Sequence, residues 1–260
     1  MGLLEGKRAL IFGLANDHSI AWGIAKAFHR EGATVGFASM EMLMEKRVKP
    51  LAAQLDSPFV EACDVQSDDD IARVFGQWQE QFGELDILVH AVAFANKDDL
   101  KGEFMNVSRE GFLLAHDVSA YSLVALAREA RPLMSDGGTI LTLSYYGAEK
   151  AVVNYNIMGV AKASLEACVR YLAVDLGKEG IRVNAISAGP VRTLSASGVS
   201  GFKKMHRLFE QISPMRRPLS IDDLGNSAVY LCSDLSRGTT GEIHYVDGGY
   251  NIIGVPEVVD

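Results

Sequence analysis

A tyrosine and a lysine seven residues apart, Tyr155 and Lys162, are the side chains whose types and spacing could do chemistry. They lie in an apolar stretch that predicts a helix over residues 155–176. Because seven residues span almost two helical turns, both side chains leave one face of that helix. A phenol and an ammonium on one face can bind and protonate a developing oxyanion. A lone pair of this kind is more often an exposed tyrosine and a solvated lysine, so the rest of the chain must decide.

The elements that would position this pair follow from an alternation of short β-rich runs and helical stretches. Strands are expected at residues 8–12, 34–38, 59–62, 85–92, 139–143, 182–186 and 243–246, and helices at 20–30, 71–81, 108–134, 155–176 and 222–232. Alternating strands and helices predict an α/β fold, a doubly wound Rossmann-type parallel sheet with helices on both faces. The 260 residues are long enough for a single domain, 1–260, with a well-buried core.

Composition excludes several classes of function. The net charge of −8 argues against a general nucleic-acid surface. No apolar run approaches the ~18 residues of a membrane span, and no targeting segment precedes the first strand. The three cysteines, Cys63, Cys168 and Cys232, lie far apart and form no metal-binding pattern. We therefore expect that the protein binds no nucleic acid, no membrane and no metal. We also expect that it is located in the reducing cytoplasm.

The first strand and the following helix predict a dinucleotide site. Gly13 ends the strand and permits a tight turn, and the helix begins near Ile20, where a doubly wound sheet binds pyrophosphate. The glycine spacing over residues 13–23 departs from the common fingerprint, so this signal is weak by itself. Ser19 either caps the helix or donates to a phosphate oxygen. Met40 follows the second strand without a neighbouring Arg or Lys, which favours NADH over NADPH.

These segments carry a resemblance to the short-chain dehydrogenase/reductase superfamily. The chain more closely resembles its NADH-dependent enoyl-acyl carrier protein reductases of bacterial fatty acid synthesis. The resemblance runs from residue 2 to about residue 249 and includes segments 109–112 (REGF), 115–117 (AHD), 143–145 (LSY), 154–156 (NYN), 162–167 (KASLEA) and 182–190 (RVNAISAGP). It implies reduction of the C2=C3 double bond of trans-2-enoyl thioesters held on acyl carrier protein, with NADH as cofactor, in a homotetramer.

The resemblance also implies roles for individual residues. Gly13, Ser19 and Ile20 would contact the pyrophosphate of the cofactor, and Val92 would lie near its middle. Met40 would contact the adenosine ribose, and Asp64 and Val65 the adenine. The nicotinamide and its phosphate would be contacted by Val191, Arg192, Thr193, Leu194 and Ser195. Lys162 would bind the nicotinamide ribose, and Tyr155 the thioester carbonyl. Tyr145 and Ala95 would line the substrate site. A segment near 193–212 would cover the substrate.

The spacing of Tyr155 and Lys162 agrees with that reaction. Ketone-reducing relatives place the lysine four residues after the tyrosine, because the oxygen that is protonated is bonded to the carbon that is reduced. In an enoyl thioester the reduced carbon is C3, whereas charge collects on the C1 oxygen three bonds away, so the phenol must lie farther from the nicotinamide. The superfamily's asparagines are also missing, since segments 90–95 (HAVAFA) and 117–119 (DVS) replace them. Both absences count against ketone reduction.

Several alternatives stay open. A ketone or alcohol oxidoreductase, a dinucleotide-binding regulator without turnover and a pure scaffold are the other classes considered. Lys203, Lys204 and Arg207 form a basic patch that either docks an acidic carrier protein or is an ordinary solvated helix face. His90 and Cys63 are expected to be packed core residues, not a base and a reactive thiol.

Overall fold

The computed structural model describes residues 2–191 and 202–255, and the side chains of residues 202–205 are not part of that description. Its sheet contains β1 (Arg8–Phe12), β2 (Thr34–Ser39), β3 (Val60–Ala62), β4 (Ile87–His90), β5 (Gly138–Ser144), β6 (Ile181–Ala188) and β7 (Ile243–Val246). All pairs are parallel, in the order β3-β2-β1-β4-β5-β6-β7. The predicted doubly wound parallel sheet is confirmed.

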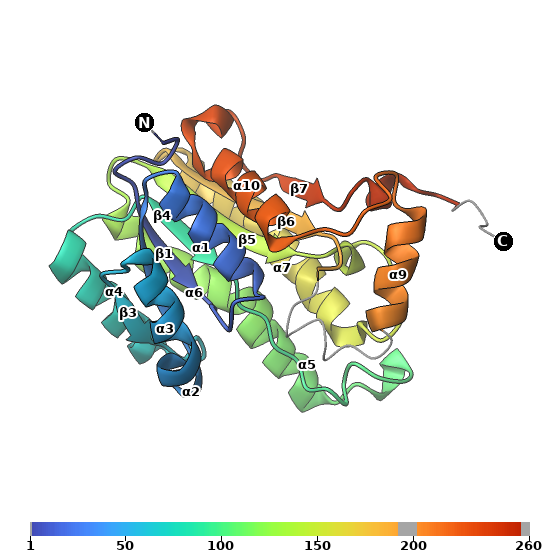
Figure 1. Cartoon of the computed structure of the whole chain (residues 1–260). Helices are drawn as coiled ribbons and strands as arrows, with labels where there is room; N and C mark the ends of the chain where they lie inside the picture. Colours follow the sequence, from blue (N-terminus) through green and yellow to red (C-terminus); the bar gives the residue numbers. More distant parts are fainter. Residues whose placement is uncertain (1, 192–201, 256–260) are drawn as a thin grey trace.

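Helices cover both faces of this sheet (Figure 1). One face packs against α1 (Ile20–Arg30), α3 (Lys49–Ala52) and α10 (Ile221–Cys232), and the other against α4 (Asp68–Phe82), α6 (Ser122–Ala130) and α7 (Asn156–Gly177). The central strands β1 and β4 are largely apolar and buried, whereas the edge strands β3 and β7 are only partly buried and carry polar residues. The helix α9 (Phe202–Ile212) stands at one end of the molecule (Figure 1). None of the helices in the described ranges is long and apolar enough to cross a bilayer.

Two expected elements differ in the structure, and one helical segment is additional. The helix expected over 108–134 is α5 (Arg109–His116) and α6 joined by a wider π-helical turn, Asp117–Tyr121. The strand expected over 85–92 is limited to β4, and the chain beyond it leaves the sheet. The helical segment formed by α2 (Glu41–Leu43), a π-helical turn and α3 was not expected. Pro50 lies in the last part of this segment, in the first turn of α3 directly after the π-helical turn.

The parallel arrangement brings the carboxyl ends of the strands to one edge. Gly13 follows β1, Met40 follows β2, Ala91 follows β4 and Tyr145 follows β5. Segments far apart in sequence therefore lie next to one another at this edge, which is where open α/β sheets bind ligands.

Candidate active site

Two tyrosine rings meet at the carboxyl end of β5. Tyr145 directly follows the strand and Tyr155 directly precedes α7, and their ring centroids are 4.9 Å apart in an edge-on arrangement. A Cβ on Gly147 would lie 2.6 Å from Tyr155 Cδ1, so a glycine is needed for the rings to pack here. Asn154 and Asn156, on either side of Tyr155, have positive φ angles of 63° and 33°. This uncommon backbone turns the phenol away from the regular course of the helix.

Both phenols keep their protons at physiological pH. Burial raises the pKa of Tyr145 to about 12, and burial also raises the pKa of Tyr155, with the neighbouring Tyr145 adding to the shift. The charged form of a phenol is disfavoured wherever water is excluded. The pair therefore presents hydrogen-bond donors, the form that an oxyanion needs.

Lys162 is held by the backbone of β5. Its ammonium Nζ donates a hydrogen bond to the Leu143 carbonyl oxygen over 2.6 Å, and the residue is only 5% exposed. Burial lowers the pKa of Lys162 to about 8, and attraction from Glu166 opposes that decrease. An ammonium has three N–H donors, and this bond uses one of them. Lys162 is therefore buried on α7 and not solvated, and Tyr155 is the residue directly before that helix.

The chain after β4 passes close to the tyrosines. Ala95 and Tyr155 both pack against a small apolar cluster, formed by Leu100, Ala115, Ile157, Met158 and Ala161. The backbone of Phe94 is fixed by Ser119, whose hydroxyl accepts from the Phe94 N–H and donates to its carbonyl over 3.0 and 3.1 Å. Ser119 lies in the π-helical turn between α5 and α6, so that turn positions the loop that carries Ala95.

At the end of β1, Gly13 forms a close approach that fits a dinucleotide. Its φ is +94°, and a Cβ there would lie 2.3 Å from the Ala91 carbonyl oxygen and 3.1 Å from Val92 Cγ2. Glycine is therefore required, and Gly13 and Val92 are neighbours in space. The helix α1 begins at Ile20, and Ser19 occupies the position before it. The Ser19 hydroxyl donates to the Asn16 carbonyl over 2.6 Å and caps none of the helix amides.

The cap expected as one role of Ser19 is therefore not formed. Because the hydroxyl bonds backward to the loop, the amide groups of the first turn of α1 lack a side-chain acceptor from Ser19. A helix N-terminus in this state presents N–H donors and the positive end of its dipole. These features fit the pyrophosphate of a dinucleotide.

A pocket of about 400 Å³ lies between the ends of β2 and β3. Its lining includes Met40, Asp64, Cys63 and Arg73. Burial raises the pKa of the Cys63 thiol to about 12, so this cysteine is a core residue, as predicted. Val65 packs against the core beside this pocket. The proximity of Met40 and Asp64 provides an adenosine-sized recess, and the residues present fit the cofactor predicted from the sequence.

The remaining predicted cofactor residues follow β6. Val191 is buried against the sheet face covered by α1 and α10. Arg192, Thr193, Leu194 and Ser195 lie outside the described residues, as do the side chains of Lys203 and Lys204. Arg207 is exposed on α9.

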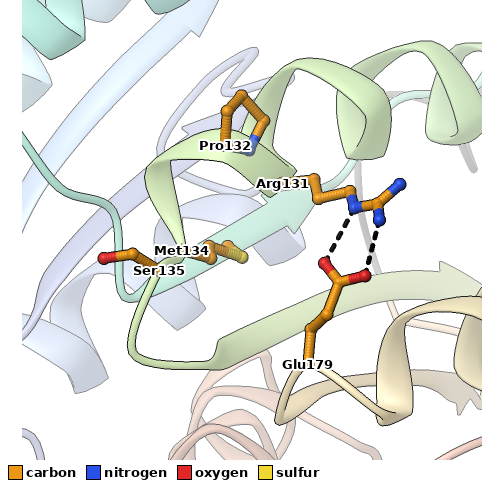
Figure 2. Close-up of a pocket in the computed structure, with 5 residues that line it drawn as sticks. All are labelled: Arg131, Pro132, Met134, Ser135 and Glu179. Carbon is orange, nitrogen blue, oxygen red and sulfur yellow. Dashed lines mark hydrogen bonds and ion pairs between the residues drawn. The ribbon is translucent and has the colours of Figure 1, made fainter.

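A second pocket, of about 380 Å³, opens at the opposite edge of the sheet (Figure 2). It is lined by Arg131, Pro132, Met134, Ser135 and Glu179, which precede β5 and β6. Arg131 and Glu179 face each other there and form a bidentate ion pair with N···O distances of 2.5 and 2.8 Å (Figure 2). The two charged side chains of this pocket are thus already paired with each other. The pocket is also remote from the tyrosines.

Sequence reasoning missed four residues that support the site. They are Gly147 beneath the tyrosines, Ser119 in the π-helical turn, and the hydrogen-bonded pair Ser144 and Glu166. Of these four residues, only Glu166 could have been found from the sequence, because it follows Lys162 by four residues and so shares its helix face. His90 is confirmed as a packed histidine: its ring nitrogens bond Thr142 and Ser122 over 2.8 Å each, and burial lowers its pKa to about 3.

Comparisons with known proteins agree with this geometry. The family model described as enoyl-(acyl carrier protein) reductase matches residues 13–251. The NADH enoyl-acyl carrier protein reductase of Aquifex aeolicus is 53% identical over 98% of this chain and 95% of its own length. The Escherichia coli enzyme of the same name is 51% identical over 99% of both chains.

Solved structures are similarly close. The Bacillus cereus enoyl-acyl carrier protein reductase with NADP⁺ and indole naphthyridinone superimposes with a TM-score of 0.96 at 51% identity, covering 98% of this chain and 100% of that one. The Anaplasma phagocytophilum reductase in complex with NAD gives a TM-score of 0.95 at 52% identity, covering 99% and 98%.

Proposed function

The chain belongs to the enoyl-acyl carrier protein reductase family, and from that membership we propose how its residues divide the reaction among them. The protein is an NADH-dependent enoyl-acyl carrier protein reductase. It reduces the C2=C3 double bond of trans-2-enoyl thioesters, the reductive step of fatty acid elongation. The observation that carries the division of roles is that the end of β5 holds both groups: Tyr145 directly after the strand contacts Tyr155, and the Leu143 carbonyl of the strand binds the buried Lys162.

Tyr155 donates its phenolic proton in a hydrogen bond to the thioester carbonyl oxygen. Negative charge grows on this oxygen as C3 is reduced, and a neutral phenol in a dry site stabilises it. The raised pKa of Tyr155 keeps the donor protonated throughout. Tyr145 packs edge-on against this ring and fixes its direction, while Ala95 supplies apolar surface for the acyl chain.

Cofactor binding is assigned to the carboxyl edge of the sheet. NADH, when bound, supplies the hydride for C3. Gly13, Val92 and the N-terminus of α1 with Ser19 and Ile20 would hold the pyrophosphate, and Met40, Asp64 and Val65 the adenosine. Lys162 would hold the nicotinamide ribose with the N–H donors that the Leu143 carbonyl leaves over. The segment Val191–Ser195 would hold the nicotinamide end.

Further proposals concern the surroundings of the site. The segment 193–212, which includes α9, covers the substrate, and the exposed Arg207 on α9 is consistent with a basic dock shared with Lys203 and Lys204 for the acidic carrier protein. The chain assembles as a homotetramer, supported by exposed apolar side chains on α7. A cytoplasmic location is supported by three free cysteines.

A spectrophotometric assay tests the function. The purified protein is mixed with NADH and either crotonyl or acetoacetyl thioester, and the loss of absorbance at 340 nm is followed. We expect turnover with the crotonyl substrate and little with the acetoacetyl substrate. The reverse preference would identify a ketone reductase. A cofactor-dependent thermal shift without turnover on either substrate would identify a dinucleotide-binding regulator.

A further inference from the structure

Helix α7 and strand β5 are joined by two side-chain braces at the active site. Lys162 and Glu166 are four residues apart and leave the same face of α7. Lys162 bonds the Leu143 carbonyl over 2.6 Å, and the next residue of β5, Ser144, donates from Oγ to Glu166 Oε1 over 2.5 Å. Ser144 is followed directly by Tyr145, so the two braces fix the backbone on which the first tyrosine stands.

Glu166 has no part in the reaction as described above, yet it is buried at 6% exposure. Burying a carboxylate is costly unless its charge is compensated. The groups that face it are Lys162 and Arg170 on its own helix, Ser144 on β5, Glu149 beyond β5 and Tyr245 on β7. The pKa of Glu166 is raised, because burial and the neighbouring Glu149 outweigh Ser144, Arg170 and Lys162, which lower it.

The two ionisable side chains that face Lys162 differ in charge. From β4 it faces His90, whose pKa is lowered to about 3 and which is therefore neutral. From its own helix it faces Glu166, and attraction from this carboxylate raises the lysine pKa against the effect of burial. In the described part of the chain, Glu166 is the anionic side chain whose attraction raises the pKa of Lys162.

We propose that Glu166 is a positioning residue of the reductase, which fixes the end of β5 through Ser144 and provides the negative charge that faces Lys162. This proposal rests on the assignment of Lys162 to the nicotinamide ribose. Glu166 acts through Lys162 and Ser144 and touches neither substrate nor cofactor. Without the charge of Glu166, Lys162 would lose its proton at a lower pH. A neutral amine is a weaker hydrogen-bond donor to the ribose and provides no electrostatic field at the oxyanion.

The test is the variant Glu166→Gln, which keeps a hydrogen-bonding group of the same size for Ser144 but removes the charge. The affinity for NADH is measured by fluorescence between pH 6.5 and 9, in the absence of substrate. We expect the pH at which affinity is lost to move down by about one unit, which makes binding up to about tenfold weaker near pH 8.5 with little change at pH 6.5. The basic limb of kcat/KM for NADH, which reports groups of the free enzyme, should move equally.

Controls separate this effect from a general loss of structure. Glu80→Gln removes one exposed charge from α4 and should keep the wild-type pH profile. Ser144→Ala removes the brace but keeps the carboxylate, so it should weaken NADH binding at every pH without moving the basic limb. A wild-type pH profile in Glu166→Gln, with wild-type thermal unfolding, would overturn the proposal. Since wild-type turnover of crotonyl thioester is measured independently, that result would leave the reductase function intact.

Discussion

At Tyr155 the proposed oxyanion donor is a phenol whose proton is retained because water is excluded. Burial disfavours the phenolate, and the edge-on ring of Tyr145 holds the side chain in place. The donor is therefore set in position before charge develops on the substrate, and it needs no reorganisation during the reaction. Gly147 is part of this arrangement, because any side chain at that position would occupy the space of the Tyr155 ring.

The substitution Tyr155→Phe tests the donor. Because the ring remains and only the hydroxyl is lost, we expect kcat/KM for enoyl thioester to fall by roughly tenfold to a thousandfold, the range for one lost oxyanion donor. NADH affinity should change little, since the ribose contact belongs to Lys162. Steady-state kinetics with crotonyl thioester and calorimetry with NADH measure the two effects. A near wild-type rate would show that another group carries the oxyanion.

At the scale of elements, the site depends on how the helices are oriented at the edge of the sheet. The N-terminus of α1 faces the proposed pyrophosphate site, and α1 packs closely against α10. Gly23 and Gly225 allow this approach, because a Cβ on either would lie 2.2–2.4 Å from a backbone oxygen of the other helix. The orientation of α10 therefore contributes to that of α1 and of its amide groups.

The start of α10 is fixed by a reciprocal cap. Ser220 Oγ accepts from the Asp223 N–H, and the Asp223 carboxylate accepts from the Ser220 N–H and from Arg217 over 2.8–3.2 Å. Hydrogen bonds from Arg217, and then those from Ser220, lower the pKa of Asp223 to about 2. A carboxyl whose pKa is depressed by folding stabilises the folded state above its unfolded pKa, and this contribution is lost as pH falls through the folded pKa.

The substitution Asp223→Asn should lower the free energy of unfolding at pH 7 by about 1 kcal/mol, as for a lost helix cap. The difference from wild type should persist down to the ordinary aspartate pKa and shrink as the pH falls further through about 2, the pKa of Asp223 in the folded state. Urea unfolding at pH 7, 4 and 3 measures it. A difference that stays constant over this range would show that the carboxylate charge plays no part in the cap.

At the scale of the whole molecule, the outer face of α7 carries an apolar surface. Tyr171 and Val174 are 77% and 79% exposed, and Val160 lies on the same helix at 38%. Large apolar side chains that gather on one face of a soluble protein commonly mark an interface. The same helix carries Lys162 and Glu166 on its buried face, so assembly through α7 would stiffen the element that holds the site.

The substitution Val174→Arg tests whether this surface joins subunits. A charge placed in a buried interface is costly, so we expect the proposed tetramer to dissociate into smaller species at micromolar concentration. Sedimentation velocity measures the size, and NADH turnover of the same samples follows the effect on the site. Leu3→Arg, at an exposed apolar residue elsewhere, serves as the matched control and should remain tetrameric. An unchanged tetramer in Val174→Arg would place the interface on another face.

The sequence by itself determined the sheet and the reacting pair. Short β-rich runs bounded by turn residues placed β1 and β7 to the residue, because residue type and turn signals are local properties of a strand. The helical pattern placed Lys162 on α7 but began one residue early, since Tyr155 is the residue directly before that helix. The helical segment from α2 to α3 and the π-helical turn at Asp117–Tyr121 were not predicted, because packing against the sheet overrides local preference there.

Only the tertiary structure decided which groups surround that pair. Ser144 and Glu166 are 22 residues apart, and Tyr155 meets Gly147 across a turn, so no local pattern could reveal these contacts. The same holds for Ser19, whose residue type predicts a helix cap but whose hydroxyl bonds backward to Asn16. The pKa values of Tyr145 and Lys162 depend on burial, a property that arises only when distant segments pack together and exclude water.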